Sequence, residues 1–432
     1  MSATIDVREL RVGMYVHLDL GWMSHPFPLS SFKISSAEQI SKIRALGLAQ
    51  VRWSPDKSDA SPAPATTAGA AGGERRPPSA ADIEAQKQAR REALAAQRAA
   101  QALAERQYAE ASQAWREVNG KVEDDPQGAR EGAEALTRAL LDKMLGDQEL
   151  CIRLLTEGAG DRATAHALNV TIVSLLMGRV FGFTENEMMD LGMGAMLHDV
   201  GKLDVPDRLK FATEGFNSAE TSLYREHVAF GVRHGKRMAV SAGTLLVIAQ
   251  HHEQADGSGF PQQLPLEKLS GAARIVALVN RYDNLCNPLH ASKALTPHEA
   301  LSLLFAQGKH KFDATMLSGF VRMMGVYPPG SLVQLTDDRY GMVVSVNSSR
   351  PLKPRVLVHD PKIARDDALY ADLERERDIG IRRSLKPAQL PPAALEYLAP
   401  GRRIAYFFEP VAHARAPELL LPAEEPPREP DA

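Results

Sequence analysis

The sequence predicts a mainly α-helical protein with a small α+β unit at the N-terminus and a short β-rich extension at the C-terminus. Three observations support this fold class. Residues 131–325 form a series of amphipathic stretches with short polar breaks, which is typical of one compact helical domain. Residues 81–130 are rich in Ala, Gln, Arg and Glu and have high helix propensity. Residues 326–411 change to alternating apolar runs, which favour strands.

The N-terminal unit is expected to span residues 1–55. Residues 12–20 and 49–53 are typical of short strands, and residues 36–46 predict a helix that begins at a Ser cap and ends at Gly47. The next stretch, residues 56–80, is rich in Pro, Ala, Gly and Ser. Because this composition buries little apolar surface, we expect a flexible linker whose first residues lie near Ser54.

The Ala-rich segment, residues 81–130, has only a few large apolar residues. Their spacing is too sparse to define a heptad seam, so a solvated spacer and a dimerising helix remain alternative hypotheses. In the C-terminal extension, residues 333–335, 342–346 and 356–358 are expected to be strands. Residues 412–432 are rich in Pro, Glu and Ala and predict a disordered tail.

Composition and charge exclude several classes of function. The net charge of −3 among 432 residues gives no electrostatic footprint for DNA. The two cysteines, Cys151 and Cys286, are too few for a disulfide scaffold and fit a reducing cytoplasm, although a single disulfide stays open. No run approaches the ~18 apolar residues of a membrane span, so the sequence predicts a cytoplasmic protein without one.

Several histidines lie in settings that favour metal binding. His198 and Asp199 end an apolar run, where burying such a pair is costly unless another group pairs with it. Imidazole nitrogen and carboxylate oxygen together suit Fe, Mn, Co or Zn. Adjacent residues diverge by about 100° around a helix, so His251 and His252 are able to face two different ions. The candidate histidines on further helices are His166 and His227, with His234 as an extra candidate.

These motifs together resemble a known family. His166, HDVGK at 198–202, His227, HHEQADGSGFP at 251–261 and RIVALVNRYDNL at 274–285 are similar in order and spacing to the HD-GYP domain. That family is a subclass of the HD phosphohydrolases and degrades the bacterial second messenger cyclic di-GMP. Residues 4–53 resemble the small domain often found before HD-GYP domains. The resemblance implies an all-helical HD-type phosphohydrolase domain over residues 131–325.

The resemblance also implies roles for individual residues. The first metal ion would be held by His166, His198 and Asp199, with Asp199 bridging to a second ion held by His227, His251 and His252. Two divalent ions, Fe or Mn, would activate water for attack on phosphorus and neutralise the developing charge. Asp199 and Lys202 are the expected catalytic residues, with Lys202 reaching a phosphate oxygen as a point charge.

The substrate-binding residues are expected in and near the DGSGFP loop at 256–261. Gly257 and Gly259 allow a sharp turn that brings backbone close to a ligand or to a protein partner. The implied contacts are made by Lys202, Gly257, Gly259, Phe260, Pro261 and Lys293.

Four departures from the family pattern qualify the site. Phe260 stands where the family has Tyr, which keeps the ring and loses the hydroxyl. Asn280 stands where relatives have a metal-binding Asp, so either Asn280 or Asp283 completes the first metal site. Arg162 replaces a glutamate associated with a third ion, which favours two ions over three. CNPLHASK at 286–293 lacks the usual arginines, and Lys293 or His290 would compensate.

The leading hypothesis is therefore a metal-dependent phosphodiesterase that opens cyclic di-GMP to pGpG and on to GMP. The alternative is an inactive HD-GYP domain that acts as a cyclic di-GMP sensor or a protein-interaction module, which Asn280 and the missing arginines favour. A third hypothesis is an HD hydrolase that acts on a hybrid cyclic dinucleotide.

Overall fold

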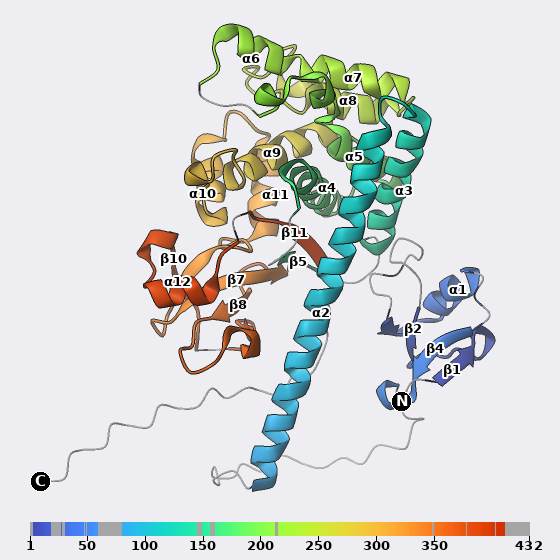
Figure 1. The fold of residues 1–432 in the computed structure, drawn as a ribbon, viewed down its shortest axis with the longest axis vertical. Coiled ribbons are helices and arrows are strands. Elements are labelled where there is room, and N and C mark those ends of the chain that lie inside the picture. The colour runs from blue at the N-terminus through green and yellow to red at the C-terminus, as the bar shows by residue number, and fades with distance from the viewer. Residues whose placement is uncertain are drawn as a thin grey trace, which may run out of the picture.

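The protein consists of a helical domain, a β-rich C-terminal extension and a small N-terminal unit (Figure 1). This computed structural model describes residues 3–18, 27, 31–46, 48, 50–58, 80–144, 149–155, 160–211, 215–347, 350–376, 378–401 and 403–410. Most of the expected linker and all of the expected tail, residues 59–79 and 411–432, lie outside the described residues.

The helices follow the amphipathic stretches of the sequence. They are α1 (Ala37–Ala45), α2 (Ala80–Lys121), α3 (Pro126–Met144), α4 (Arg162–Val180), α5 (Glu185–Leu197), α6 (Ser218–Arg225), α7 (His227–Arg237), α8 (Ala242–Gln250), α9 (Gly271–Cys286), α10 (Pro297–Gln307), α11 (Ala314–Met324) and α12 (Pro392–Leu398).

The strands form two sheets. They are β1 (Ala3–Asp6), β2 (Tyr15–His17), β3 (Ser31–Lys33), β4 (Gln50–Ser54), β5 (Leu150–Leu154), β6 (Leu332–Leu335), β7 (Tyr340–Asn347), β8 (Arg355–Val358), β9 (Ala371–Asp372), β10 (Ile381–Leu385) and β11 (Tyr406–Pro410). The first sheet has the order β1-β4-β2-β3. The second has the order β10-β6-β7-β5-β11, with β8 and β9 joined to β7.

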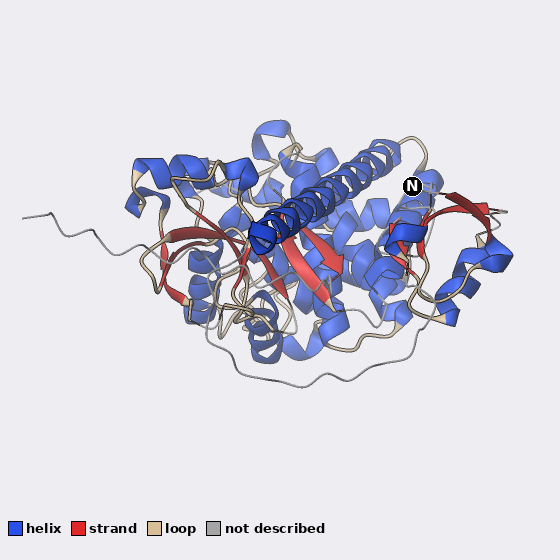
Figure 2. Ribbon diagram, turned by 90° about the horizontal axis from the view of Figure 1, so that it is seen from below, coloured by secondary structure: helices blue, strands red, loops and turns tan. Residues whose placement is uncertain are grey.

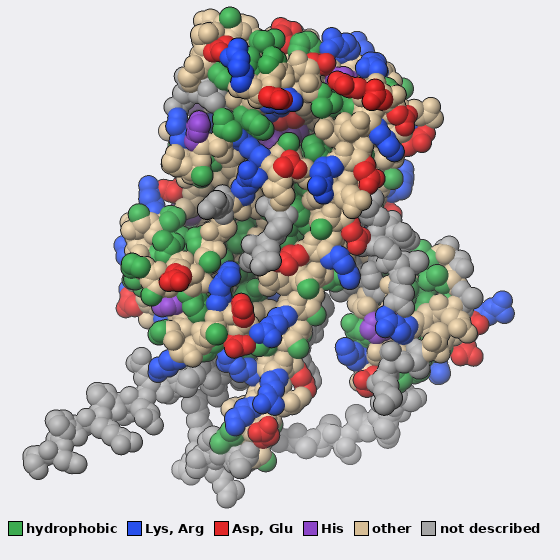
Figure 3. Space-filling view, viewed as in Figure 1, with side chains coloured by type: hydrophobic (Ala, Val, Ile, Leu, Met, Phe, Trp, Pro, Cys, Tyr) green, Lys and Arg blue, Asp and Glu red, His purple; other side chains and the backbone are tan. Residues whose placement is uncertain are grey.

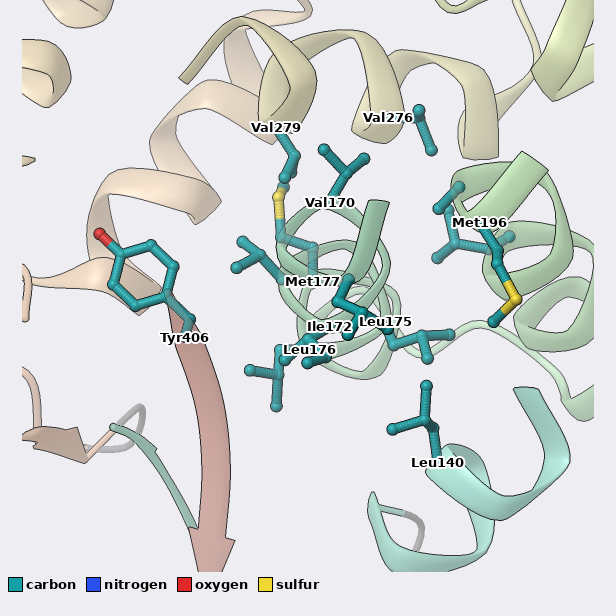
Figure 4. Close-up of a cluster of buried hydrophobic side chains, with 14 of the residues drawn as sticks. Leu140, Val170, Ile172, Leu175, Leu176, Met177, Met196, Val276, Val279 and Tyr406 are labelled. Atoms are coloured by element: carbon teal, nitrogen blue, oxygen red, sulfur yellow. The ribbon is translucent and has the colours of Figure 1, made fainter. Parts of the chain in front are cut away.

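Helix α4 is the centre of the helical domain. It begins at Arg162, where the side chain of Asp161 accepts a hydrogen bond from the Thr164 amide at 3.0 Å. Nearly every position from Ala165 to Gly178 is apolar or small and is buried, as expected for a helix surrounded on all sides. Figure 4 shows α4 end-on, with its side chains directed toward those of α3, α5, α9 and β11.

Helix α4 also bears on the expected absence of a membrane span. By length and composition alone it is the one helix among the described residues that could cross a membrane. However, 78% of its apolar window is buried inside the protein, as in a core helix.

The cysteines are both buried and free, so no disulfide forms between Cys151 and Cys286.

Helix α2 is more than a solvated spacer. In its C-terminal half, Tyr108 and Ala111 are 1% and 0% exposed and belong to the main core. In its N-terminal half, Gln97 donates a hydrogen bond to the carbonyl of Ala368 at 2.9 Å, in the C-terminal extension. Figure 2 shows α2 crossing the molecule over strands of the larger sheet. The spacer interpretation is therefore wrong for these parts of α2, whereas the dimer hypothesis stays a prediction.

Strand β5 is the main departure from the expected helical domain at 131–325. It pairs antiparallel with β7 and β11 and so joins the helical domain to the C-terminal extension. All five of its residues are buried. Its sequence, four apolar residues and Arg153, is too short to show a helical or a strand periodicity, and its partner strands lie far along the chain. The strands expected in the extension are found as β6, β7 and β8.

The N-terminal unit has its own small core. The expected helix is α1, capped by Ser36, and the expected strands appear as the shorter β2 and as β4. Because β4 runs to Ser54 and a 3₁₀ turn follows at Pro55–Lys57, the first residues of the expected linker at 56–80 are ordered as part of the N-terminal unit. The unit contacts the helical domain where the buried Lys143 of α3 donates a hydrogen bond to the Phe27 carbonyl at 2.8 Å.

Candidate metal centre

The candidate ligands lie at helix ends that meet beside α4. His198 ends α5, and Asp199 precedes the 3₁₀ turn η4 (Val200–Asp204). His227 is the first residue of α7, and His251 follows the last residue of α8. His166 lies in the first turns of α4. In Figure 3 a group of histidine side chains is recessed in the upper part of the face shown.

A first cluster joins His166, His198 and Asp199. The Nε2 atoms of the two histidines are 3.2 Å apart. Oδ2 of Asp199 lies 3.6 Å from Nε2 of His166 and 3.4 Å from Nε2 of His198. The donor atoms of the three residues converge within 4.8 Å of one another, as the ligands of one ion would.

A second cluster uses the opposite oxygen of the same carboxylate. Oδ1 of Asp199 lies 3.6 Å from Nε2 of His227 and 3.8 Å from Nε2 of His251. Each of these residues and His252 offers one donor atom within 4.8 Å of the others. Asp199 therefore presents one oxygen to each cluster, which is the arrangement of a carboxylate that bridges two ions.

The ring orientation of three histidines is fixed by a contact of Nδ1 with a backbone carbonyl. Nδ1 of His198, His227 and His251 contacts the carbonyl three residues earlier, at 2.7, 2.5 and 2.8 Å respectively. A proton on Nδ1 that donates to a carbonyl leaves Nε2 as the lone-pair donor. Metal-binding histidines are held in this way in known sites, so the geometry fits ligands.

Asp283 fixes the ring orientation of His166 in the same way, through Nδ1. Its Oδ2 lies 2.6 Å from Nδ1 of His166, and its Oδ1 accepts hydrogen bonds from Asn169 and Asn287 at 2.7 and 2.9 Å. Both carboxylate oxygens of Asp283 therefore already have hydrogen-bond partners within the protein. Oδ1 of Asn280 accepts a hydrogen bond from Asn284 at 2.6 Å. These bonds favour Asp283 as a positioning residue and give Asn280 a protein partner.

Two polar atoms of the second cluster are buried and have no hydrogen-bond partner among the described residues. They are Oδ1 of Asp199 and Nε2 of His252. Leaving a buried acceptor unpaired costs roughly 1–3 kcal/mol, so such atoms indicate a group that binds there. A divalent cation would satisfy both atoms. The residues present therefore fit a metal centre.

Electrostatics favour the same conclusion. Burial lowers the pKa of His227 to about 4 and holds the pKa values of His251 and His252 well below the usual range, so these rings are neutral and free to bind a cation. Burial opposes the charged form of Asp199, but Lys202 and the neighbouring histidines outweigh it and keep its pKa well below the ordinary value. The cluster thus holds one carboxylate among neutral imidazoles.

Lys202 lies beside the bridging carboxylate. Its Nζ is 2.5 Å from Oδ2 of Asp199, and this partner outweighs burial and raises the pKa of Lys202. The turn η4 that holds Lys202 packs directly on α7. A Cβ at Gly201 would lie 1.9 Å from the His227 carbonyl oxygen, so only glycine fits at that position.

The Gly-Phe-Pro loop lies against the second cluster. The Phe260 ring stacks on His252 with 4.4 Å between ring centroids and 19° between planes. A Cβ at Gly259 would lie 2.4 Å from the Gln254 amide nitrogen and from Cα of Glu253. The buried Glu253 accepts hydrogen bonds from the amides of Gln262 and Leu264 at 2.7 and 3.0 Å. The loop is therefore fixed to the segment that follows α8.

A cavity of about 690 Å³ opens beside the centre, between α9, α10 and this loop. Among the expected substrate-binding residues, Lys202, Phe260 and Lys293 line it, and His290 and Arg162 line it too. Gly257, Gly259 and Pro261 do not line it.

Two residues that line the cavity, Tyr224 and Arg281, were not among the expected site residues. Arg281 lies within the motif at 274–285, and Tyr224 has no sequence signal except its position near His227. His234, the extra candidate, is absent from both clusters, because its Nε2 lies 2.6 Å from Oδ2 of Asp204, at the end of η4.

A family model described as an HD domain matches residues 149–316. Residues 149–316 are an HD domain. The family model described as a domain of unknown function, DUF3391, matches residues 2–133, which includes α2 as well as the N-terminal unit. The resemblance drawn from the motifs is confirmed at this level, and both His/Asp clusters lie within the HD domain.

Several characterised proteins are similar to the chain. The cyclic di-GMP phosphodiesterase PA4108 of Pseudomonas aeruginosa is 28% identical over 372 residues, which are 83% of this chain and 85% of that protein. The cyclic di-GMP phosphodiesterase response regulator RpfG of Xanthomonas campestris is 30% identical over 35% of this chain and 40% of its own length. The 3'3'-cGAMP-specific phosphodiesterase 2 of Vibrio cholerae is 28% identical over 35% of this chain and 30% of its own length.

Proposed function

We propose that the protein is a metal-dependent phosphodiesterase that hydrolyses cyclic di-GMP to linear pGpG, and further to GMP. The observation that supports this most strongly is the placement of Asp199, which directs one carboxylate oxygen toward each histidine cluster. Two ions bridged in this way would activate water and neutralise charge on the phosphoryl oxygens. The names of the similar proteins support phosphodiester hydrolysis of a cyclic dinucleotide.

The residues around the clusters suit this chemistry. His198, His227 and His251 each hold Nε2 toward the centre without rotation, because Nδ1 is bound to a carbonyl. Lys202 provides a cation at the edge of the centre, where a phosphate oxygen would lie. The cavity beside them has room for a dinucleotide and is lined by the further cations Arg162, Arg281, Lys293 and Lys311.

The donor set also bears on the choice of ion. It consists of imidazole nitrogens and one carboxylate, with no cysteine in either cluster among the described residues. Nitrogen and oxygen donors suit Fe, Mn, Co and Zn, and of these we propose Fe or Mn as the native ions. Asn280 and Asp283 do not enter the proposed ligand set, because both side chains already have protein partners.

The test is turnover by the full-length protein loaded anaerobically with Fe²⁺ or with Mn²⁺. Cyclic di-GMP is supplied, and pGpG and GMP are separated by chromatography. We expect turnover by the wild type and a loss of at least about 10³-fold in Asp199→Asn, because the amide cannot bridge two ions with charge. Asp360→Asn makes the same chemical change in the C-terminal extension and is expected to leave turnover unchanged.

The sensor hypothesis predicts a different result. A chain that binds cyclic di-GMP but turns it over with none of Fe, Mn, Co and Mg would contradict the proposed function. Turnover that persists in Asp199→Asn would contradict the proposed metal centre, but it would still support phosphodiesterase activity.

A hybrid cyclic dinucleotide is the second candidate substrate. It is favoured by the similarity to the 3'3'-cGAMP-specific enzyme of Vibrio cholerae. Supplying cyclic di-GMP and 3'3'-cGAMP together at equal concentration measures the ratio of their kcat/KM values directly. We expect cyclic di-GMP to be consumed first, and a ratio in favour of 3'3'-cGAMP would reassign the substrate.

A further inference from the structure

Arg162 stands apart from the other cations of the cavity. Its Nη1 is buried and has no hydrogen-bond partner among the described residues. Lys202, by contrast, is paired with the Asp199 carboxylate at 2.5 Å. A guanidinium stays protonated at any physiological pH, so its unpaired N–H groups cost free energy unless an anion occupies the space beside them.

The side chain of Arg162 is held in place by an aromatic ring. Its guanidinium carbon lies 4.2 Å from the ring centroid of Phe211, a distance typical of a cation–π contact. Nζ of Lys202 lies 5.8 Å from the same centroid and 5.7 Å from the centroid of Tyr224. Arg162 and Lys202 therefore approach the same Phe211 ring from different elements, the first turn of α4 and the turn η4.

Two like charges brought together repel each other. Burial lowers the pKa of Arg162, and the carboxylates of Asp283 and Asp199 offset this only in part. Such an arrangement is stable when an anion lies between the two cations, and both of them line the cavity beside the metal clusters.

We propose that Arg162 binds a phosphate group of the substrate together with Lys202. The planar guanidinium offers two parallel N–H groups to two phosphate oxygens, whereas Lys202 acts as a point charge. The inference rests on the proposed function for the identity of the substrate. The anion subsite itself follows from the geometry of Arg162, Lys202 and the cavity.

The test is the binding of inorganic phosphate to the full-length, Mn²⁺-loaded protein by titration calorimetry. Replacing a charged, bidentate donor is expected to weaken phosphate binding on the order of tenfold to a hundredfold in Arg162→Gln. Arg162→Lys, which keeps the charge and loses the fork, is expected to restore part of the affinity. Metal content, measured in each variant, is expected to equal that of the wild type.

Arg403 provides a matched control. It lies close enough to Arg162 to influence its pKa, but it is exposed, donates to the Gly160 carbonyl at 2.9 Å and does not line the cavity. Arg403→Gln removes the same charge and is expected to leave phosphate affinity unchanged. Equal losses in Arg162→Gln and Arg403→Gln would overturn the proposal, because they would indicate a general charge effect.

Two further results of the calorimetry would overturn the proposal that Arg162 contacts phosphate directly. Unchanged phosphate affinity in Arg162→Gln, or a loss that parallels a loss of bound metal, would overturn a direct contact. With cyclic di-GMP, Arg162→Gln is expected to raise KM more than it lowers kcat. Because phosphate binding requires no turnover, absence of phosphodiesterase activity would refute the proposed function without affecting the calorimetric result.

Discussion

At the scale of single residues, the site is organised around one carboxylate. The two oxygens of Asp199 face different sets of histidines. Oδ1 of Asp199 and Nε2 of His252, which have no hydrogen-bond partner among the described residues, lie where a cation would bind. The order of the motifs in the sequence was enough to identify these histidines. Their second hydrogen bonds were not apparent, because backbone carbonyls at Ala195, Tyr224 and Ile248 leave no sequence signal.

The first prediction concerns the open choice between Asn280 and Asp283. Asp283→Ala removes the partner of His166 Nδ1 and is expected to lower metal affinity by about 10–100-fold. Asn280→Ala is expected to leave metal affinity within about twofold, because its oxygen is bound to Asn284. Metal content after dialysis against graded chelator measures both. The reverse ranking of the two variants would make Asn280 the ligand.

At the scale of elements, close backbone contacts place the loops that surround the centre. Gly201 lets η4 touch α7, and Gly259 lets the Gly-Phe-Pro loop touch the segment after α8. The sequence indicated a sharp turn at 256–261 from its glycines. It could not indicate that Phe260 stacks on His252, because stacking depends on the path of the folded chain.

The second prediction tests that contact. Gly259→Ala places a methyl group 2.4 Å from backbone atoms of Glu253 and Gln254 and is expected to lower the free energy of unfolding by about 1–3 kcal/mol. At Gly380 an added Cβ would lie 3.6 Å from its nearest neighbour. Gly380→Ala is therefore expected to change the free energy of unfolding by less than about 0.5 kcal/mol. Urea denaturation measures both, and equal stabilities would refute the steric argument.

The elements that were difficult to foresee are those that depend on distant partners. Amphipathic periodicity predicted a helical domain over residues 131–325, and alternation located β6, β7 and β8. Strand β5 was missed because it pairs with β7 and β11, which lie far along the chain. The burial of the C-terminal half of α2 was missed because it depends in part on α4 and β11. Short apolar runs and sparse apolar spacing do not specify such partners.

At the scale of the whole molecule, the metal centre ties together helices that are separate in sequence. A cation bound by residues of α4, α5, α7 and α8 binds only the folded chain, so it stabilises that state by mass action. The third prediction is that chelation lowers the thermal midpoint of the wild type. At a free metal concentration 100 times Kd, the loss corresponds to about 2.7 kcal/mol.

The control for this prediction is His252→Ala, which removes one donor of the second cluster. Its thermal midpoint is expected to respond less to chelator than that of the wild type. Identical responses of the two proteins would place the stabilising ion elsewhere.

The fourth prediction concerns the contact between the N-terminal unit and the helical domain. Burial lowers the pKa of Lys143 to about 7, with Asp142 and Glu110 offsetting part of the effect. In the unfolded chain a lysine titrates near 10.4. Between these values the unfolded state binds more protons, so the stability of the wild type rises with pH across this window.

Lys143→Met removes this titration and serves as the comparison. The free energy of unfolding of the wild type minus that of the variant is expected to rise between pH 7 and 10, by up to about 1.4 kcal/mol per pH unit. Other titrating groups are shared by both proteins and cancel in the difference. A difference that is constant with pH would contradict the buried, neutral state of Lys143.

The most direct test of the central claim is the position of the ions relative to Asp199. Anomalous diffraction from crystals of the manganese-loaded protein locates them without assumptions about activity. The account predicts two peaks, one beside His166 and His198 and the second beside His227, His251 and His252, with the Asp199 carboxylate between them. A single peak, or peaks that do not contact Asp199, would contradict it.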